Sequence, residues 1–361
     1  MRPFKYSPKL VRNIGRLESR IWIVGRFPGQ QDHKAGYAFA KGAAFLLREA
    51  FGYTEMDFRT AHCRNIVPHL PPLGKVDSWL LPKKELPADA LPFSHILGPV
   101  GGKYLHPDIL PFVAELQQAL QEHRPNVIVA LGSEACRILT GTDKIGQARG
   151  ALYDCQLVPG IKVIPTYHPA SCFANAAFQP VFNADIIKAV RESAYPERRL
   201  KSRRVHVAET VADLHEFRDT YGSGAATVDI ETVPNWKQIT DVGIAYSDTD
   251  VLVIPILDKT KPDYSYWSAP DEYQVWEFIR QVLEDPDVQL RGQGYIYDAT
   301  WLYQLMLIKS VEYRGDPLVL HHALYPEMDK DLGFLGSLYC DEIAWKNLAS
   351  FKQAKLEGKL K

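Results

Sequence analysis

Short apolar runs that each end near a glycine or proline recur through the first half of the chain, and helical patterns alternate with them. The strand-like runs are RIWIVG (20–25), NVIVALG (126–132) and KVIPTYHP (162–169). The helical patterns include GAAFLLREAFG (42–52) and ILPFVAELQQALQEH (109–123). A chain that alternates strands with helices in this way folds around a mostly parallel sheet. The first half therefore predicts an α/β fold.

The second half differs, because three strand patterns follow one another before its first long helix. These patterns are AATVDIET (225–232), ITDVGIAYS (239–247) and DVLVIPI (250–256), followed by a helix at 272–285, a short strand at 288–294 and a helix at 298–307. This order predicts a second α/β domain that opens with an antiparallel meander.

A polar, basic run with one proline, AYPERRLKSRR, separates the two patterned regions. We expect a first domain over residues 1–193, a linker over 194–204 and a second domain over 205–361. A chain of 361 residues with 46% apolar residues is long enough for two cores.

The two halves carry opposite charge. Residues 1–204 hold 28 Lys and Arg against 17 Asp and Glu, whereas residues 205–361 hold 14 against 26. A basic half suits a polyanion such as nucleic acid, and an acidic half suits carboxylates gathered around metal ions. Uneven but solvated surface charge is the alternative interpretation.

Several classes of protein are disfavoured by composition. No apolar stretch approaches the ~20 residues needed to cross a bilayer, and the first residues lack the apolar stretch of a signal peptide. We expect a cytoplasmic protein with no membrane partner. The cysteines are scattered without a CxxC pair, which argues against a disulfide framework and a four-thiolate metal site. They are Cys63, Cys136, Cys155, Cys172 and Cys340.

Three acids in the second half are candidates for one site. Asp229 and Glu231 lie two apart on a strand pattern, so their side chains share one face. A divalent cation between them would relieve their repulsion, and hard oxygen ligands suit Mg²⁺ or Mn²⁺. Asp298, at the start of a helical run after a strand, is the candidate third ligand. Two metals in such a cluster can activate water and stabilise the leaving oxygen of a phosphodiester.

The spacing Asp-x-Glu is weak by itself, but GQGYIYDATWL (292–302) follows about seventy residues later. Together these stretches resemble the proofreading 3′–5′ exonuclease domain of polymerase I-type DNA polymerases, of the RNase H-like fold. The stretch 315–346 resembles the exonuclease domains of bacteriophage polymerases. The resemblance implies that Asp229, Glu231 and Asp298 are catalytic metal ligands, acting on the 3′ end of single-stranded DNA.

Such domains use a fourth acid in a Tyr-x-x-x-Asp pattern on a late helix. Tyr325 and Asp329 have this spacing, but Pro326 disfavours a helix interior, so we do not assign them this role. We expect the second domain to be truncated before that helix, with its metal site incomplete, and a polymerase domain to follow downstream.

Loops at the strand ends of the first half form a second ordered set: IVGRFPGQQD (23–32), AGYAF (35–39), CRNIVPHLPP (63–72), VIVALGSEACRILTG (127–141), IGQARG (145–150) and IPTYHPAS (164–171). In this order they resemble the thermophile-type branch of the uracil-DNA glycosylase superfamily. The resemblance spans about residues 20–190. It implies an α/β/α sandwich with a parallel central sheet.

The same resemblance implies roles in binding and excising uracil from DNA. Phe39 would stack on the extruded base, and the amide of Asn65 would match uracil O4 and N3–H. His168 would donate a hydrogen bond to O2 as negative charge develops there, and Ser171 would hold a phosphate. Singly, Phe39 reads as a core residue, Asn65 as a turn residue and His168 as a histidine before a proline turn. Gly25, Pro28 and Gly29 would let backbone N–H groups face the ligand.

Two departures from the branch bear on activity. Arg26 stands where the first motif has an acid, and Asp32 is the nearest carboxylate in that loop. The four cysteines that hold an iron–sulfur cluster in that branch have no equivalents, so we expect no cluster.

Taken together, the two halves make the chain resemble the N-terminal part of a bacteriophage DNA polymerase. The resemblance implies that the protein acts in an infected bacterial host. The alternative is a non-catalytic module that senses uracil or grips the template, beside an inactive exonuclease domain.

Overall fold

The computed structural model describes residues 4–199, 201–233, 235 and 237–340, and it divides the chain into two compact units. One unit comprises residues 1–199 together with the stretch that begins at Gly333, and the other comprises residues 200–332. This division departs from the predicted one, because the end of the chain from Gly333 was expected in the second domain. No described helix is both long enough and apolar enough to cross a membrane.

The first unit is built around a five-stranded sheet in the order β2-β1-β5-β7-β6. Neighbouring strands run parallel except β6, which pairs antiparallel with β7. The strands are β1 (Ile21–Gly25), β2 (His62–Asn65), β5 (Val127–Leu131), β6 (Tyr153–Asp154) and β7 (Lys162–Thr166). The helices are α1 (Gln30–Ala35), α2 (Gly42–Gly52), α4 (Leu110–His123), α5 (Gly132–Thr140), α6 (Ile145–Ala148), α7 (Pro169–Ala174) and α8 (Phe178–Glu192).

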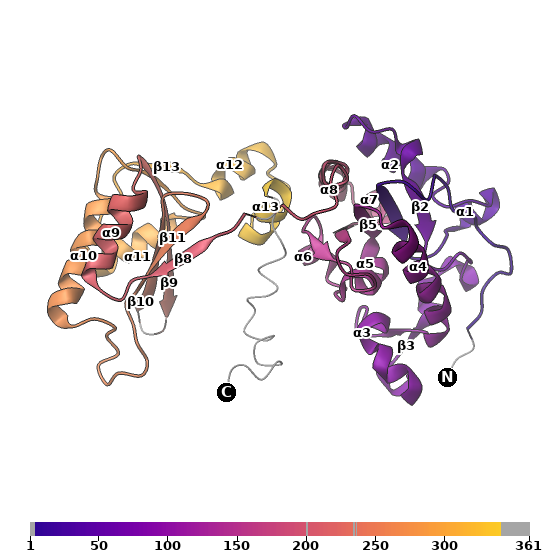
Figure 1. Ribbon diagram of the computed structural model, residues 1–361, viewed down its shortest axis with the longest axis horizontal. Coiled ribbons are helices and arrows are strands. Elements are labelled where there is room, and N and C mark those ends of the chain that lie inside the picture. Colours follow the sequence, from indigo (N-terminus) through magenta and orange to yellow (C-terminus); the bar gives the residue numbers. More distant parts are fainter. Residues whose placement is uncertain (1–3, 200, 234, 236, 341–361) are drawn as a thin grey trace. The chain divides into compact units, whose positions relative to one another are not determined.

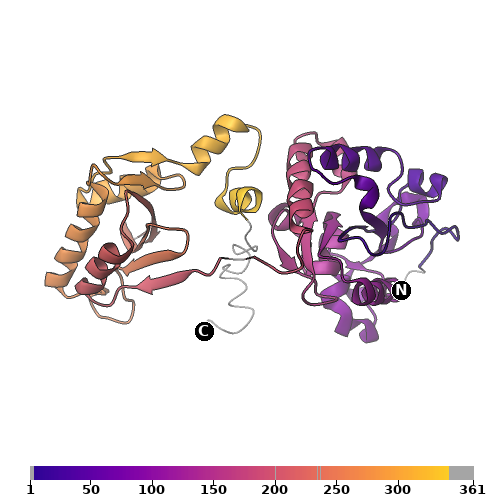
Figure 2. The same cartoon turned by 45° about the horizontal axis from the view of Figure 1, so that its top comes forward.

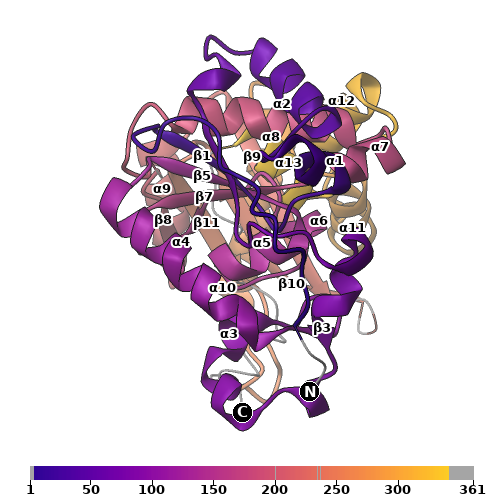
Figure 3. The same ribbon diagram turned by 90° about the vertical axis from the view of Figure 1, so that its right-hand side faces the viewer.

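Helices cover both faces of this sheet, because successive strand residues point to opposite sides. Trp22 and Val24 of β1 join one apolar cluster with α4 and α5. Ile21 and Ile23 join another with α2 and α8. Figure 3 shows the strands between these two helical layers. The predicted α/β/α sandwich is confirmed.

The long segment between β2 and α4 packs on the first cluster instead of forming an open loop. It contains β3 (Leu80–Leu81), α3 (Ser94–Leu97) and β4 (Tyr104–Leu105), with short 3₁₀ turns between them. Trp79 and Leu97 are buried in the core formed with α4 and α5.

The second unit is built around a six-stranded mixed sheet in the order β13-β12-β9-β10-β11-β8. Figure 1 labels β8, β9, β10, β11 and β13 of this sheet. The strands are β8 (Arg204–Val207), β9 (Ala225–Val233), β10 (Gln238–Ala245), β11 (Asp250–Pro255), β12 (Gln289–Arg291) and β13 (Tyr313–Gly315). As predicted, β9, β10 and β11 form an antiparallel meander. The expectation that the domain opens with this meander was wrong, because β8 and a helix over Val211–Tyr221 precede it. β12 runs parallel to β9, and β8 runs parallel to β11.

Helices α9 (Val211–Tyr221) and α10 (Ala269–Leu283) lie side by side in this unit (Figure 2). The N-terminus of α10 is stabilised, because Ser268 caps the helix and Pro270 lies in its first turn. The other helices are α11 (Ile296–Met306) and α12 (Pro317–Leu324). The α/β class predicted for this half is confirmed as well.

Helix α13 (Leu332–Tyr339) packs on the first unit through buried polar groups. The Ser337 hydroxyl accepts a hydrogen bond of 2.8 Å from Arg149 Nη1, and the Ser337 carbonyl accepts one from Lys188 Nζ. The guanidinium of Arg149 also lies 5.0 Å from the ring centre of Phe334. These contacts explain why α13 groups with the first unit.

Candidate functional site

The predicted glycosylase residues gather at one edge of the first sheet. Gly25 ends β1 and pairs in register with Asn65, which ends β2; Gly132 follows β5 and His168 follows β7. Because β2, β1, β5 and β7 are parallel neighbours, their carboxyl ends meet at the same edge. This is the edge where open α/β sheets bind ligands.

Gly25, Phe39 and Asn65 fit closely together. A Cβ atom added at Gly25 would lie 2.6 Å from Asn65 Oδ1 and 2.9 Å from Phe39 Cζ, so only glycine fits here. Asn65 is buried, and its Nδ2 has no hydrogen-bond partner among the described residues. A buried donor without a partner costs free energy unless a ligand satisfies it. Asn65 therefore keeps an unsatisfied donor at the end of β2.

Phe39 is 2% exposed and belongs to the apolar core with α2 and α8. Its backbone has a φ of 53°, a strained value for a residue with a side chain. Phe39 is thus a core residue in this structure. Its stacking on a base stays a prediction.

Asp32 holds the loop that carries Phe39. Its carboxylate accepts hydrogen bonds of 3.0 Å from Gly29 N and 2.7 Å from Ala40 N. Burial raises the pKa of Asp32, while the backbone donors oppose that shift. The N–H of Gly29 is therefore engaged by Asp32, and neither Pro28 nor Gly29 lines the cavity described next. This differs from the prediction that this loop's N–H groups face a ligand.

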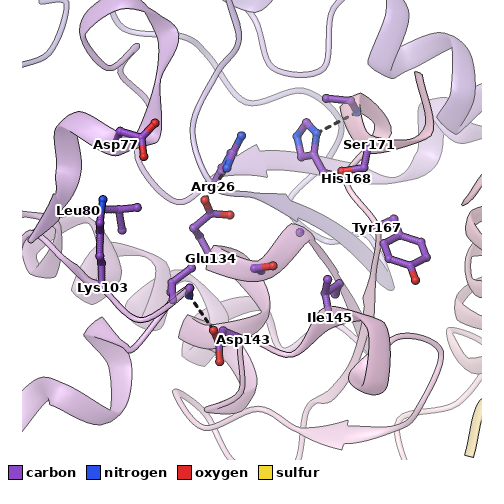
Figure 4. A pocket seen from close by; sticks show the side chains of 15 residues that line it. Arg26, Asp77, Leu80, Lys103, Glu134, Asp143, Ile145, Tyr167, His168 and Ser171 are labelled. Carbon is purple, nitrogen blue, oxygen red and sulfur yellow. Dashed lines mark hydrogen bonds and ion pairs between the residues drawn. The ribbon is translucent and has the colours of Figure 1, made fainter. Parts of the chain in front are cut away.

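A cavity of about 490 Å³ opens at the same sheet edge (Figure 4). Arg26, Glu134, His168 and Ser171 line it, and residues of the β2–α4 segment such as Lys103 contribute the facing side. Both predicted residues of the α7 loop, His168 and Ser171, thus border the cavity, whereas Gly25, Phe39 and Asn65 are buried beside the strand ends and do not border it.

His168 is held in one tautomer. Its Nδ1 accepts a hydrogen bond of 3.1 Å from Ala170 N at the start of α7, so the proton resides on Nε2. Burial, and then the nearby charge of Arg26, lower the pKa of His168 to about 3. The imidazole is therefore neutral near pH 7 and able to donate a hydrogen bond through Nε2.

Arg26, the residue that departs from the glycosylase pattern, forms an ion pair of 2.5 Å with Glu134. Its guanidinium also lies 4.5 Å from the ring centre of Phe27. Sequence reasoning missed Glu134, because one glutamate at a helix start carries no signal of its own. The ion pair joins residues 108 positions apart.

The three acids of the second unit are neighbours. Asp298 lies in the first turn of α11, and its Oδ1 accepts a hydrogen bond of 3.1 Å from Ile230 N, the residue between Asp229 and Glu231. Burial chiefly, and then the charges of Asp229 and Glu231, raise the pKa of Asp298 to about 6. Burial also raises the pKa of Asp229.

Gly292 lets α11 approach β9, because a Cβ there would lie 2.6 Å from Tyr295 Cδ2 and 3.0 Å from the Val228 carbonyl. The Tyr297 hydroxyl bonds Thr232 Oγ1 at 2.7 Å and ties the helix to the same strand.

The donor chemistry of these acids suits a hard divalent cation. As the side chains lie, however, no group of three or more His, Cys, Asp or Glu within the described residues is arranged to hold a metal ion. The geometry therefore brings the acids side by side without forming a finished coordination shell. Tyr325 follows the end of α12 and Asp329 lies in the loop beyond, so this pair does not share a helix.

Comparison with known proteins finds similarity over the first unit. Residues 13–191 match the model of the uracil DNA glycosylase superfamily. The chain is 26% identical over 161 residues to the type-4 uracil-DNA glycosylase of Thermotoga maritima, covering 45% of this chain and 70% of that protein. It is 24% identical over 196 residues to the type-4 uracil-DNA glycosylase of Saccharolobus solfataricus, covering 51% and 76%.

Solved structures similar to the chain include exonuclease domains. The EXD2 exonuclease domain soaked in Mg is 13% identical, with a TM-score of 0.26 over 33% of this chain, and the chain spans 58% of its length. The Aedes aegypti Nibbler EXO domain is 15% identical, with a TM-score of 0.27 over 36% of this chain and 61% of its own. Scores this low carry no argument about function, so the second unit's chemistry is argued from its acids.

Proposed function

We propose that the first unit excises uracil from DNA. The observation that carries this proposal is the buried Asn65 amide, whose Nδ2 has no hydrogen-bond partner among the described residues. The amide lies against Gly25, where there is no room for a side chain. An amide fixed in this way distinguishes uracil, whose O4 accepts and whose N3–H donates, from cytosine, which presents the reverse pattern.

His168 is suited to the chemical step. When the bond between C1′ and N1 breaks, its electron pair leaves with uracil and negative charge spreads to O2. A neutral imidazole that donates through Nε2 stabilises this charge without first losing a proton. The pKa of about 3 keeps His168 in that form across the physiological range. Ser171 lies in the first turn of α7 and lines the cavity, and we propose that it holds a DNA phosphate.

Incubation of the chain with uracil-containing single- and double-stranded oligonucleotides tests this proposal. Abasic sites should appear with uracil and not with thymine, and Asn65→Asp, which replaces the donor by an acceptor, should lower the excision rate at least ~100-fold. If the unaltered protein leaves no abasic sites in either substrate, the proposal is wrong.

A non-catalytic module that senses uracil or grips the template is the second interpretation of this unit. Arg26 in the first motif and the excess of basic residues in positions 1–204 favour it. It predicts preferential binding of uracil-containing DNA, with an affinity that falls steeply with salt, and no abasic product.

For the second unit we propose metal-dependent 3′–5′ exonuclease activity. Its support is Asp298, which is hydrogen bonded to the backbone between Asp229 and Glu231. These three carboxylates would hold Mg²⁺ or Mn²⁺, which when bound would activate water and stabilise the leaving oxygen. The α11–β9 contacts keep Asp298 in place beside the other two acids.

Degradation of 5′-labelled single-stranded DNA in Mg²⁺ or Mn²⁺ tests this second activity. Asp229→Asn should reduce shortening from the 3′ end at least ~100-fold, whereas Asp219→Asn, an exposed change on α9, should leave it intact. Equal degradation by both variants would exclude the site.

We propose further that the chain is the N-terminal part of a bacteriophage DNA polymerase that works in the cytoplasm of the host. The resemblance of residues 315–346 to phage exonuclease domains supports this context. The coding sequence beyond Lys361 tests it, since a helix with Tyr-x-x-x-Asp and polymerase motifs should follow.

A further inference from the structure

The first sheet edge contains a carboxylate, although the first motif supplies none. Arg26 occupies the position of the missing acid, and its Nη1 donates a hydrogen bond of 2.5 Å to Glu134 Oε1. The carboxylate thus comes from α5, after β5, which is the neighbour of β1 in the sheet.

Glu134 is placed toward the proposed reaction site. It lines the cavity together with His168, and its side chain is only 8% exposed. A Cβ added at Gly132 would lie 3.3 Å from His168 Cβ and 3.8 Å from Glu134 Oε2, so both residues flank the same glycine. Figure 4 shows Glu134 directed at Arg26, with His168 on the other side of the arginine in this view.

One oxygen of Glu134 is available for a further partner. Oε1 binds Arg26, whereas Oε2 has no hydrogen-bond partner among the described residues. Asp32 is the carboxylate nearest to Arg26 in the sequence, but neither of its oxygens is available. They already accept hydrogen bonds from Gly29 N and Ala40 N. Asp32 therefore shapes the loop, and Glu134 faces the cavity.

We propose that Glu134 is the catalytic carboxylate that orients and deprotonates the attacking water, and that Arg26 is a positioning residue that fixes its orientation. This inference rests on the proposed glycosylase function. In the step, the C1′–N1 bond breaks and its electron pair leaves with uracil. The water oxygen then bonds to C1′ while one water proton passes to Glu134 Oε2, and this proton afterwards passes to solvent or to the uracil anion. No oxidant, reductant or metal is required.

The experiment compares single-turnover uracil excision by the full chain and by Glu134→Gln, with DNA affinity and thermal unfolding measured in parallel. Glutamine keeps the size of the side chain and an oxygen for Arg26, so affinity and unfolding midpoint should stay close to those of the unaltered protein. The excision rate should fall ~100-fold or more. Glu122→Gln on α4, an exposed change, should retain the full rate.

Chemical rescue separates a catalytic carboxylate from a structural one. Added formate should restore part of the rate of Glu134→Ala, because a small carboxylate can occupy the vacated volume, and it should not restore Asp32→Asn. Should Glu134→Gln unfold, Glu134→Asp decides the question, since it keeps the charge but withdraws it by one carbon and should be slower at least ~10-fold.

The outcomes distinguish the two proposals. If the unaltered protein excises uracil and Glu134→Gln excises it equally fast, the role of Glu134 is wrong and the glycosylase function stands. If Glu134→Ala loses the excision rate and formate does not restore it, the catalytic role of Glu134 is also wrong. If the unaltered protein excises no uracil, the proposed function fails and this inference fails with it.

Discussion

At the scale of single residues, the packing at the strand ends of the first sheet requires two glycines, because a side chain at either position would crowd its neighbours. Gly25 leaves room for Asn65 and Phe39, and Gly132 leaves room for His168. In the segment from Gly29 to Ala40, the buried carboxylate of Asp32 accepts hydrogen bonds from the backbone N–H groups of both end residues. A ligand site of this kind is sensitive to a single methyl group.

Replacing Gly25 by alanine should test that sensitivity. The new Cβ would lie 2.6 Å from Asn65 Oδ1, so the amide must move from its position at the end of β2. We expect excision of uracil to fall at least ~100-fold and the unfolding free energy to fall by about 1–3 kcal/mol. Gly52→Ala is the matched control, because nothing lies within 4 Å of its added Cβ. Unchanged excision by Gly25→Ala would show that Asn65 is not needed in its present position.

A second residue-scale prediction concerns acid stability. His62 is buried against Trp22, with ring centres 4.5 Å apart, and burial lowers its pKa to about 4. Because the unfolded chain binds this proton near pH 6.5 and the folded chain only near pH 4, the stabilisation is complete above 6.5. It is lost as the pH falls from 6.5 toward 4.

We expect the first unit to lose on the order of 2 kcal/mol between pH 6.5 and 4.5 through His62, and His168 should add to this loss. In His62→Asn the loss should be smaller, whereas His95→Asn, at an exposed position, should behave like the unaltered protein. Hydrogen exchange in β1 and β5 as a function of pH measures the effect. An identical pH dependence in His62→Asn would contradict it.

At the scale of elements, α13 completes a polar network in the first unit. Arg149 is 1% exposed and pairs with Asp185, which also accepts a hydrogen bond from Thr166. Ser337 on α13 supplies the acceptor for the remaining Nη1 of Arg149. A buried guanidinium is stable only when its donors are satisfied, so α13 acts as part of this unit despite its place in the sequence.

Ser337→Ala should therefore lower the stability of the first unit by about 1–3 kcal/mol, because Arg149 Nη1 loses this acceptor. Hydrogen exchange should become faster in β7 and α8 and stay unchanged in β9 and β10. Ser202→Ala, an exposed serine between the predicted domains, is the control. Equal exchange rates in both variants would mean that the contact contributes nothing to stability.

At the scale of the whole molecule, two cores and two candidate sites coexist in one chain. The cavity with His168 lies in the first unit, and the acids around Asp298 lie in the second. The excess of basic residues in positions 1–204 and of acidic residues beyond them suits the DNA binding proposed for the first unit and the metal site proposed for the second.

Because the sites belong to separate units, their activities should be separable by mutation. Asp229→Asn should abolish shortening of DNA and leave the rate of uracil excision within about twofold, and His168→Asn should do the reverse. Parallel assays of both activities on the same preparations measure this. Loss of both activities in either variant would show that the two sites depend on each other.

The sequence by itself determined the α/β class of both halves, the strand ends at which Gly25, Asn65 and His168 lie, and the common face of Asp229 and Glu231. These features follow from local rules, since the alternation of a strand and the residues that end it are set within a few positions. The tertiary structure alone decided that Arg26 pairs with Glu134, that Asp32 is engaged by its own loop, and that α13 joins the first unit. Each of these depends on contacts between residues that strand order and helix packing bring together, and no local pattern encodes such contacts.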